Sequence, residues 1–420
     1  MSLVLTPGQT VEPTPPARVS RPAQRVWLWI GLVLFALATT RVLTGADDIG
    51  SAGTMRAALV AAVPIALAGL GGLWSERAGV INIGLEGMMI LGTLGAGYYG
   101  YHWGVWAGLL GAALFGLIGG VLHAVATVVF GVDHIVSGVA INIIAAGIAR
   151  FLAEAWFSDL EGGGPTQSPS IDSPPTITVP GLSDWSADLA DKEWYLISDA
   201  AALVNALVED MSVFTLLALA LIAGTGWLLW KTAFGLRLRS CGEAPVAAET
   251  LGVNVYRYKF IAVTMSGVFA GLGGAYLAMV ASSGYQNDMT NGRGYIGLAA
   301  MIFGNWRPGG LLAGSLLFGY TDAARLRSGG ESIHALMLIL AVALIALAIW
   351  QWRRQQKVMA AVTAGIGVVS GLVFALTDEI PGDFTEMSPY IATMLVLALA
   401  SQRLRVPAAD GKRYRRGEAT

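Results

Sequence analysis

The sequence predicts an all-α polytopic membrane protein with about 10 full transmembrane helices plus two short or half helices and an inverted internal repeat. Three observations support this fold class. Hydrophobic residues make up 55% of the 420 residues and charged residues only 13%, whereas soluble domains carry about 25% charged residues. The mean hydropathy is +0.62. The 54 glycines suit helices that pack closely in lipid, where small residues let backbones approach.

Apolar stretches long enough to cross a bilayer recur along most of the chain. They lie at about 26–43, 55–74, 80–99, 105–130, 135–157, 212–230, 260–280, 332–350, 358–376 and 388–402. Two further apolar pieces, about 294–305 and 309–321, are too short to cross ~30 Å of hydrocarbon comfortably. We expect these two to be half helices or a re-entrant pair buried in protein.

Charge places the loops between these stretches. Loop 158–211 holds ten acidic residues and one basic residue, Lys192, whereas loop 231–259 and segment 403–420 are basic. Because positive charge stays inside, we expect a multi-pass protein of the plasma membrane with both termini cytoplasmic. The predicted organisation is a disordered cytoplasmic tail (1–24), a first transmembrane half (25–157), an extracytoplasmic acidic loop (158–211), a second transmembrane half (212–350), an additional transmembrane pair (351–402) and a basic cytoplasmic tail (403–420).

A short glycine-rich pattern occurs twice. The sequence AGLGG stands at 68–72 and again at 270–274, and MILG at 89–92 is echoed by MIFG at 301–304. The first copy lies on a span predicted to run inward and the second on one predicted to run outward, so the repeat is inverted. Inverted repeats with interrupted helices place a transport path near the membrane midplane. Chance similarity in so glycine-rich a chain is the alternative.

The stretch ERAGVINIGLEGMM at 76–89 interrupts apolar sequence with polar residues. Asn82 and Glu86 are four residues apart, which predicts that they share one face of a helix. A carboxylate within a membrane helix costs at least a few kcal/mol, so Glu86 must face protein or water. Asn82 and Glu86 either line the substrate pathway or join this span to a neighbour, and the second interpretation is favoured. Asn142 is the next polar candidate for the pathway.

The basic loop 231–259, predicted to be cytoplasmic, contains a short helix signal. Pro245 suits a first helical turn and Gly252 suits a left-handed residue after the last turn. A short helix held between two spans is either a docking element for a soluble partner or an ordinary interfacial helix. The candidate docking residues are Glu243, Pro245, Ala247, Ala248, Leu251 and Gly252.

Three stretches resemble permeases of ATP-binding-cassette (ABC) importers. The loop has the Ala-Ala-x-x-x-Gly core of their coupling segment at 247–252. The stretch 76–89 resembles the signature of nucleoside (guanosine-type) and simple-sugar permeases, which belong with the ribose and branched-chain amino-acid permeases. GYIGLA at 294–299 and Pro-Gly-Gly at 308–310 match the second-half pattern of that family. The resemblance covers about 57–350, and it departs at the loop 158–211 and the added C-terminal spans.

The resemblance implies half of a translocation pathway for nucleosides, with simple sugars as the alternative. It implies a second permease subunit, identical or related, an ATP-binding subunit docked on the cytoplasmic loop, and an extracytoplasmic substrate-binding protein or lipoprotein. An ion-coupled secondary transporter is a less favoured alternative that the inverted repeat also allows. Membrane lipid surrounds the chain, and no nucleic-acid partner is expected.

Enzyme chemistry is not indicated. The single cysteine, Cys241, excludes an internal disulfide, and there is no P-loop, zinc spacing or other catalytic motif. We therefore expect no cofactor, no metal and no catalytic residues. The histidines are scattered through the sequence, and Arg150 and Glu154 are spaced to pair along one helix. ATP hydrolysis is left to the partner subunit.

Overall fold

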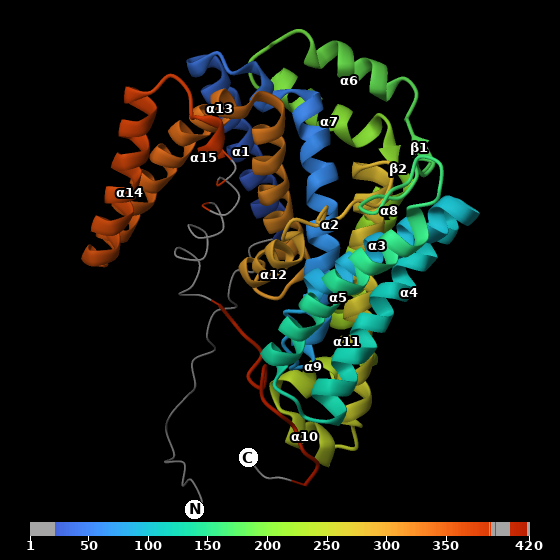
Figure 1. The fold of residues 1–420 in the computed structure, drawn as a ribbon. Helices are drawn as coiled ribbons and strands as arrows, with labels where there is room; N and C mark the ends of the chain where they lie inside the picture. Colours follow the sequence, from blue (N-terminus) through green and yellow to red (C-terminus); the bar gives the residue numbers. More distant parts are fainter. Residues whose placement is uncertain (1–21, 386, 388–390, 392–403, 418–420) are drawn as a thin grey trace, which may run out of the picture.

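The computed structural model describes residues 22–385, 387, 391 and 404–417. Helices account for nearly all of its regular structure (Figure 1). They are α1 (Pro22–Thr44), α2 (Ala52–Arg77), α3 (Leu85–Trp103), α4 (Val105–Ala124), α5 (His134–Phe157), α6 (Leu182–Ala190), α7 (Ile197–Val208), α8 (Val213–Lys231), α9 (Ala233–Glu243), α10 (Pro245–Thr250), α11 (Val255–Tyr276), α12 (Arg293–Phe303), α13 (Pro308–Arg353), α14 (Lys357–Leu376) and α15 (Gly382–Thr385). A 3-10 turn (Asp47–Gly50) precedes α2, and π-helical turns extend α4 (Val125–Val129) and α11 (Leu277–Ala281).

Among the described residues, seven helices are long and apolar enough to cross a membrane. They are Ala52–Arg77, Val105–Val129, His134–Phe157, Val213–Lys231, Val255–Ala281, Gly329–Arg353 and Lys357–Leu376. This confirms a polytopic all-α membrane protein. Helix α3 has the length of a span, but its glycines, its tyrosines and Glu86 make it less apolar. The predicted span 388–402 lies outside the described residues except for residue 391, as does the predicted tail 1–24 apart from Pro22–Gln24, so the exact span count stays a prediction.

The two predicted half helices differ from each other. Helix α12 is short, with 11 residues. Helix α13, by contrast, continues beyond position 321 to a break at Gly329 (φ 54°), so the expected end at 321 is wrong. The part before the break is not among the seven helices apolar enough to cross a membrane, and its role as a half helix stays a prediction. The acidic residue that follows position 321 is paired inside the protein. Asp322 accepts from Arg293 of α12 at 3.1 Å and from Arg325 at 2.9 Å.

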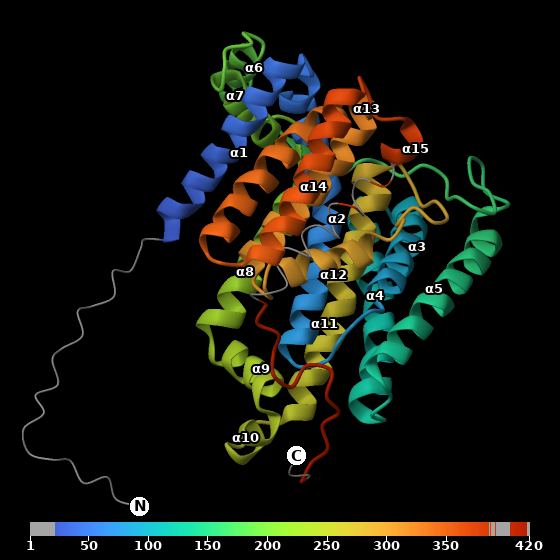
Figure 2. The ribbon, with the colours of Figure 1, turned by 90° about the vertical axis from the view of Figure 1, so that its left-hand side faces the viewer.

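The two glycine-rich copies lie on α2 and α11, which pack against each other at the centre of the bundle (Figures 1 and 2). A Cβ added to Gly71 would lie 2.5 Å from the carbonyl oxygen of Ser266. A Cβ added to Gly273 would lie 3.1 Å from that of Pro64. The glycines thus allow backbone contact between the two helices. Their relation as an inverted repeat stays a prediction.

Loop 158–211 folds over one end of the bundle. Residues Thr176–Ile177 (β1) pair antiparallel with Met211–Ser212 (β2), and α6 and α7 lie between them. The loop is held to the helices beneath it by ion pairs. Arg41 meets the buried Asp199 at 3.2 Å, and Arg56 meets Glu209 at 2.7 Å.

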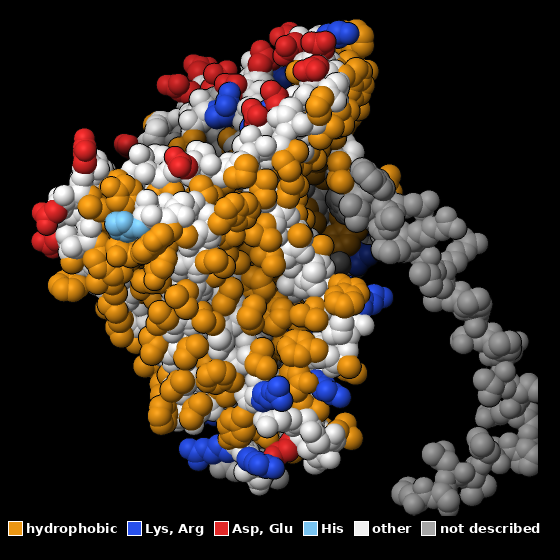
Figure 3. All heavy atoms as spheres, turned by 90° about the vertical axis from the view of Figure 1, so that its right-hand side faces the viewer, with side chains coloured by type: hydrophobic (Ala, Val, Ile, Leu, Met, Phe, Trp, Pro, Cys, Tyr) orange, Lys and Arg blue, Asp and Glu red, His pale blue; other side chains and the backbone are white. Residues whose placement is uncertain are grey.

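The two ends of the molecule differ in charge (Figure 3). Acidic side chains gather at the α6–α7 end, which we call the acidic end, and Lys and Arg gather at the opposite end. That opposite, basic end carries α9 and α10 (Figure 1). A broad apolar belt separates the two ends, as expected for a protein with its middle in lipid.

Candidate functional site

The stretch 76–89 folds as a turn between two helices rather than as continuous helix. Helix α2 ends at Arg77, Gly79 takes a left-handed conformation (φ 82°), and α3 begins only at Leu85. Ser75 closes the turn because its hydroxyl donates to the carbonyl oxygen of Val80 at 2.5 Å. The prediction that Asn82 shares a helix face with Glu86 is therefore wrong. The left-handed conformation of Gly79 releases the chain from the helix before α3 starts.

Asn82 lies fully buried in this turn. Its amide nitrogen donates to the hydroxyl of Ser266 on α11 at 2.6 Å, and its amide oxygen accepts from the backbone N–H of Gly84 at 3.0 Å. The side chain thus connects the turn to α11. Ser266 was not singled out from the sequence, since a serine in an apolar helix carries no signal of its own.

Glu86 lies at the start of α3, and its carboxylate faces the N-terminus of α12. One oxygen accepts from the N–H of Gly292 at 2.9 Å and the other from the N–H of Gly294 at 2.7 Å. The first N–H groups of a helix lack internal partners and carry partial positive charge, so a carboxylate there is stabilised. A Cβ at Gly294 would lie 2.6 Å from the backbone of Glu86, so this contact requires glycine. The geometry favours the interpretation that Glu86 joins α3 to a neighbour.

Asn142 of α5 completes this polar network. Its side chain accepts from the N–H of Gly87 at 2.8 Å and donates to the carbonyl oxygen of Ile83 at 3.0 Å. It also donates to the hydroxyl of Tyr295 on α12 at 2.8 Å. The sequence analysis gave Tyr295 no role of its own, although the residue is 46% exposed and is the accessible aromatic part of the network. A role of Asn82, Glu86 and Asn142 in the pathway stays a prediction.

Two histidines that are far apart in sequence meet at the same turn. His123 of α4 contacts the carbonyl oxygen of Ile81 at 3.0 Å and the hydroxyl of Ser137 at 2.8 Å. His134 of α5 accepts from the N–H of Ile81 at 3.4 Å. One ring nitrogen of each histidine thus pairs with a backbone group of Ile81, in a stretch of chain that has no helical partners. The description of the histidines as scattered holds for the sequence only.

The end of α2 connects to the basic end of the molecule. Glu76 accepts from the indole N–H of Trp306 at 2.6 Å, and Arg77 donates to the carbonyl oxygen of Trp306 at 2.8 Å. Arg77 also lies 3.7 Å from Glu243 at the end of α9. Residues at the α2 end therefore contact both the α12–α13 turn and the predicted docking loop.

The predicted short helix in that loop is present as α10. Pro245 stands in its first turn and Gly252 follows it with φ 81°, which confirms both end signals. Ala248 is buried against Cys241 and Val255, so it faces inward. Leu251 is 84% exposed, and Ala247 also faces outward. Glu243, before the helix, is exposed as well.

Arg150 does not pair along its helix. It donates two hydrogen bonds of 3.0 Å to the carboxylate of Asp288, in the loop before α12. The predicted pair with Glu154 is therefore wrong, because a partner from another segment lies closer in space. Among the described residues, no group of three or more His, Cys, Asp or Glu side chains is arranged to hold a metal ion.

Comparison with known proteins agrees with this architecture. Residues 54–349 match the family described as the permease component of branched-chain amino acid transport systems. The chain is 32% identical to the guanosine ABC transporter permease protein NupQ of Bacillus subtilis, over 86% of this chain and 96% of that protein. It is 33% identical to the nucleoside ABC transporter permease protein NupC of Lactococcus lactis, over 85% and 94% respectively.

A third relative carries a different substrate in its name. The putative glucose ABC transporter permease protein TsgC13 of Haloferax volcanii is 32% identical over 67% of this chain and 80% of that protein. No solved structure matches the chain.

Proposed function

Because this chain belongs to the family of permease components of branched-chain amino acid transport systems, we propose that it is the membrane-spanning permease subunit of an ABC importer for nucleosides. It is a transport component rather than an enzyme, and it works with an ATP-binding subunit and a substrate-binding protein. The observation that carries the proposal is α10. This helix lies at the basic end of the molecule (Figure 1) and leaves Leu251 84% exposed, as expected of a docking element for the ATP-binding subunit.

The coupling residues in this proposal form two groups. Pro245 and Gly252 shape α10, and Ala248 packs it onto the protein. Ala247, Leu251 and Glu243 form the outward contact. A leucine that is buried on docking contributes roughly 1.5–3 kcal/mol.

The membrane orientation follows from the charges. We assign the basic end to the cytoplasm and the acidic end to the outside, which puts both termini in the cytoplasm. The proposed partners are then an ATP-binding subunit at the basic end and a substrate-binding (lipo)protein at the acidic end. A second permease subunit, identical or related, completes the pathway within the bilayer.

The pathway itself is assigned to the region around α12. Helix α12 is a short helix whose N-terminus is held by Glu86, and it contacts both α2 and α3. Interrupted helices of this kind line the path in transporters built from inverted repeats. The exposed ring of Tyr295 supports a nucleoside over a simple sugar, since a heterocyclic base can stack on an aromatic face.

Reconstitution tests the proposal. The chain is inserted into liposomes with its ATP-binding subunit, its second permease subunit and its binding protein, and uptake of labelled guanosine and ribose is measured with and without ATP. We expect ATP-dependent uptake of guanosine. ATP-dependent uptake of ribose alone would make it a sugar permease, and uptake by this chain alone along an ion gradient would make it a secondary transporter.

A further inference from the structure

Residues 404–417 cross the basic end of the molecule as a non-helical segment, which we call the strap (Figure 2). The strap is attached through backbone hydrogen bonds. The N–H of Arg405 donates to the side chain of Asn305 in the α12–α13 turn at 2.7 Å, and the N–H of Ala409 donates to the carbonyl oxygen of Gly242 on α9 at 2.8 Å. Both partners thus lie at least 100 residues before the strap in the chain.

The strap holds one side of α10. The hydroxyl of Tyr414 donates to the carboxylate of Glu249 at 2.5 Å, and Arg416 pairs with the other oxygen of Glu249 at 3.0 Å. The ring of Tyr414 packs against the cluster around Ala248. Leu251, on the outward side of α10, remains 84% exposed. The strap therefore occupies the inner side of α10 and leaves the docking side open.

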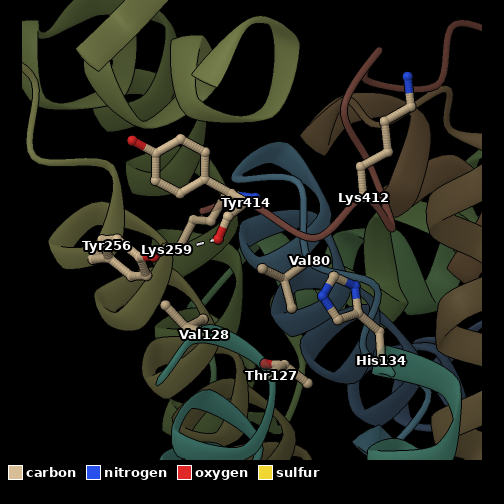
Figure 4. A pocket seen from close by; sticks show the side chains of 8 residues that line it. All are labelled: Val80, Thr127, Val128, His134, Tyr256, Lys259, Lys412 and Tyr414. Carbon is tan, nitrogen blue, oxygen red and sulfur yellow. Dashed lines mark hydrogen bonds between the residues drawn. The ribbon is translucent and has the colours of Figure 1, made fainter. Parts of the chain in front are cut away.

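The same strap also contacts the turn that leads to Asn82 and Glu86. A Cβ on Gly79 would lie 3.1 Å from the carbonyl oxygen of Ala409, and a Cβ on Gly411 would lie 2.8 Å from the side chain of Ile81. Lys412 and Tyr414 of the strap border a small cavity whose other wall includes Val80 and His134 (Figure 4). The strap is thus in contact with both α10 and the 78–84 turn.

We propose that the strap is a positioning element that keeps α10 attached to the 78–84 turn throughout transport, so that displacement of α10 by the ATP-binding subunit moves this turn. The proposal rests on the function proposed above, since it requires docking at α10. A helix of six residues is not stable alone. Charge-assisted hydrogen bonds from Tyr414 and Arg416 give α10 a second attachment besides its own chain. Tyr414 and Arg416 are the positioning residues.

The first test removes both contacts to Glu249 with the double substitution Tyr414→Phe and Arg416→Gln, in the complete reconstituted importer. We expect the ATP-binding subunit to co-purify and basal ATP hydrolysis to stay close to wild type. Guanosine uptake per ATP hydrolysed should fall by about fivefold or more, the usual size of coupling between two sites. Arg413→Gln is the matched control, since it removes a strap charge that faces solvent, and it should leave this ratio unchanged.

The second test restores the attachment covalently. Tyr414→Cys with Glu249→Cys should uncouple uptake from hydrolysis, and joining the two thiols with a short bismaleimide should restore the coupling. The native Cys241 reacts slowly because burial raises its pKa to about 11. Each single cysteine variant, treated with the same reagent, controls for modification.

Three results would overturn the proposal. An unchanged ratio in both double variants would make the strap a passive terminus. A rise in basal hydrolysis together with faster uptake would make it a brake. A cross-link that blocks uptake would show that the strap must leave α10 during the cycle. Each result is compared with uptake and ATP hydrolysis by the wild-type importer. ATP-driven uptake by the wild type itself tests the proposed function separately.

Discussion

The polar network around the 78–84 turn and the loop that carries α10 both stand out in the sequence, yet their side chains are used in opposite ways. Glu86, Asn82 and Asn142 turn inward, and each bonds at least one backbone N–H group. Leu251 turns outward, and the described part of the chain leaves it 84% exposed. A polar side chain in an apolar motif is thus first a means of satisfying backbone groups, whereas an exposed apolar side chain on a projecting helix indicates a partner.

The strongest test of this difference is Glu86→Ala. It leaves two N–H groups at the start of α12 without partners in a buried place, and each unpaired group costs about 1–3 kcal/mol. We expect the free energy of unfolding to fall by roughly 2–6 kcal/mol, measured by denaturant titration in detergent micelles. The free energy of unfolding of Glu86→Gln should lie between those of the wild type and of Glu86→Ala, because its side chain offers one acceptor oxygen instead of two.

Glu154→Gln on α5 is the control for removing a membrane carboxylate, because Glu154 is exposed. It should leave unfolding unchanged. If Glu86→Ala unfolds like wild type but abolishes uptake, Glu86 serves the pathway and the contrast between the two regions fails.

Leu251→Asp should weaken only the association of the chain with the ATP-binding subunit. The substitution places a charge on the docking side of α10, and we expect affinity for the ATP-binding subunit to fall by about 10–100-fold, in line with the loss of one buried leucine. Unfolding of the isolated chain should not change. Co-purification and a binding titration measure the effect.

Ala248→Arg is the informative comparison for Leu251→Asp. Because Ala248 is buried against Cys241 and Val255, the larger side chain should disturb the loop itself and lower its stability. Equal loss of binding with unchanged stability in both variants would contradict the inward placement of Ala248.

Tyr295→Ala tests the one accessible aromatic residue of the polar network. If its ring contacts the base of a nucleoside, guanosine uptake at low substrate concentration should fall by about tenfold, since stacking on a base contributes roughly 1–3 kcal/mol. Tyr295→Phe keeps the ring and should retain most of the uptake. Loss of uptake in Tyr295→Phe as well would point to the hydrogen bond with Asn142 instead.

The smallest effect concerns pH at the strap. Burial raises the pKa of Asp410 to about 7, although the Gly411 N–H, Glu76, Lys259 and Arg77 act against this rise. Because its pKa is raised where the strap lies against the protein, Asp410 binds its proton more tightly when the strap is attached than when it is detached. The strap is therefore held most strongly at low pH. This stabilisation of the attached strap is complete below about pH 4 and is lost as the pH rises to about 7.

We therefore expect the strap to open about tenfold more often at pH 8 than at pH 6. Hydrogen exchange of residues 404–417, corrected for the intrinsic effect of pH, measures this. Asp410→Asn should weaken this pH dependence, and the neighbouring carboxyl group of Glu76 accounts for what remains. A strap that opens equally at both pH values in the wild type would remove Asp410 from this role.

The sequence alone was sufficient for the class of protein, the family and the ends of α10. These depend on local properties: apolar length, charge asymmetry, a proline in a first turn and a left-handed glycine after a last one. The start of α5 also agrees with the sequence, because Asp133 accepts from the N–H groups of Ile135 and Val136.

Only the tertiary structure decided what the polar residues contact. Asn82 does not lie on the expected helix, because Gly79 and Ser75 end α2 and shape a turn. Helix α13 continues beyond Asp322 because Arg293 and Arg325 neutralise that carboxylate. Arg150 pairs with Asp288, and Arg416 of the strap pairs with Glu249 at the basic end. Inside an apolar protein, each polar side chain bonds with the groups that the fold places within bonding distance. The spacing of residues in the sequence does not give these distances in space.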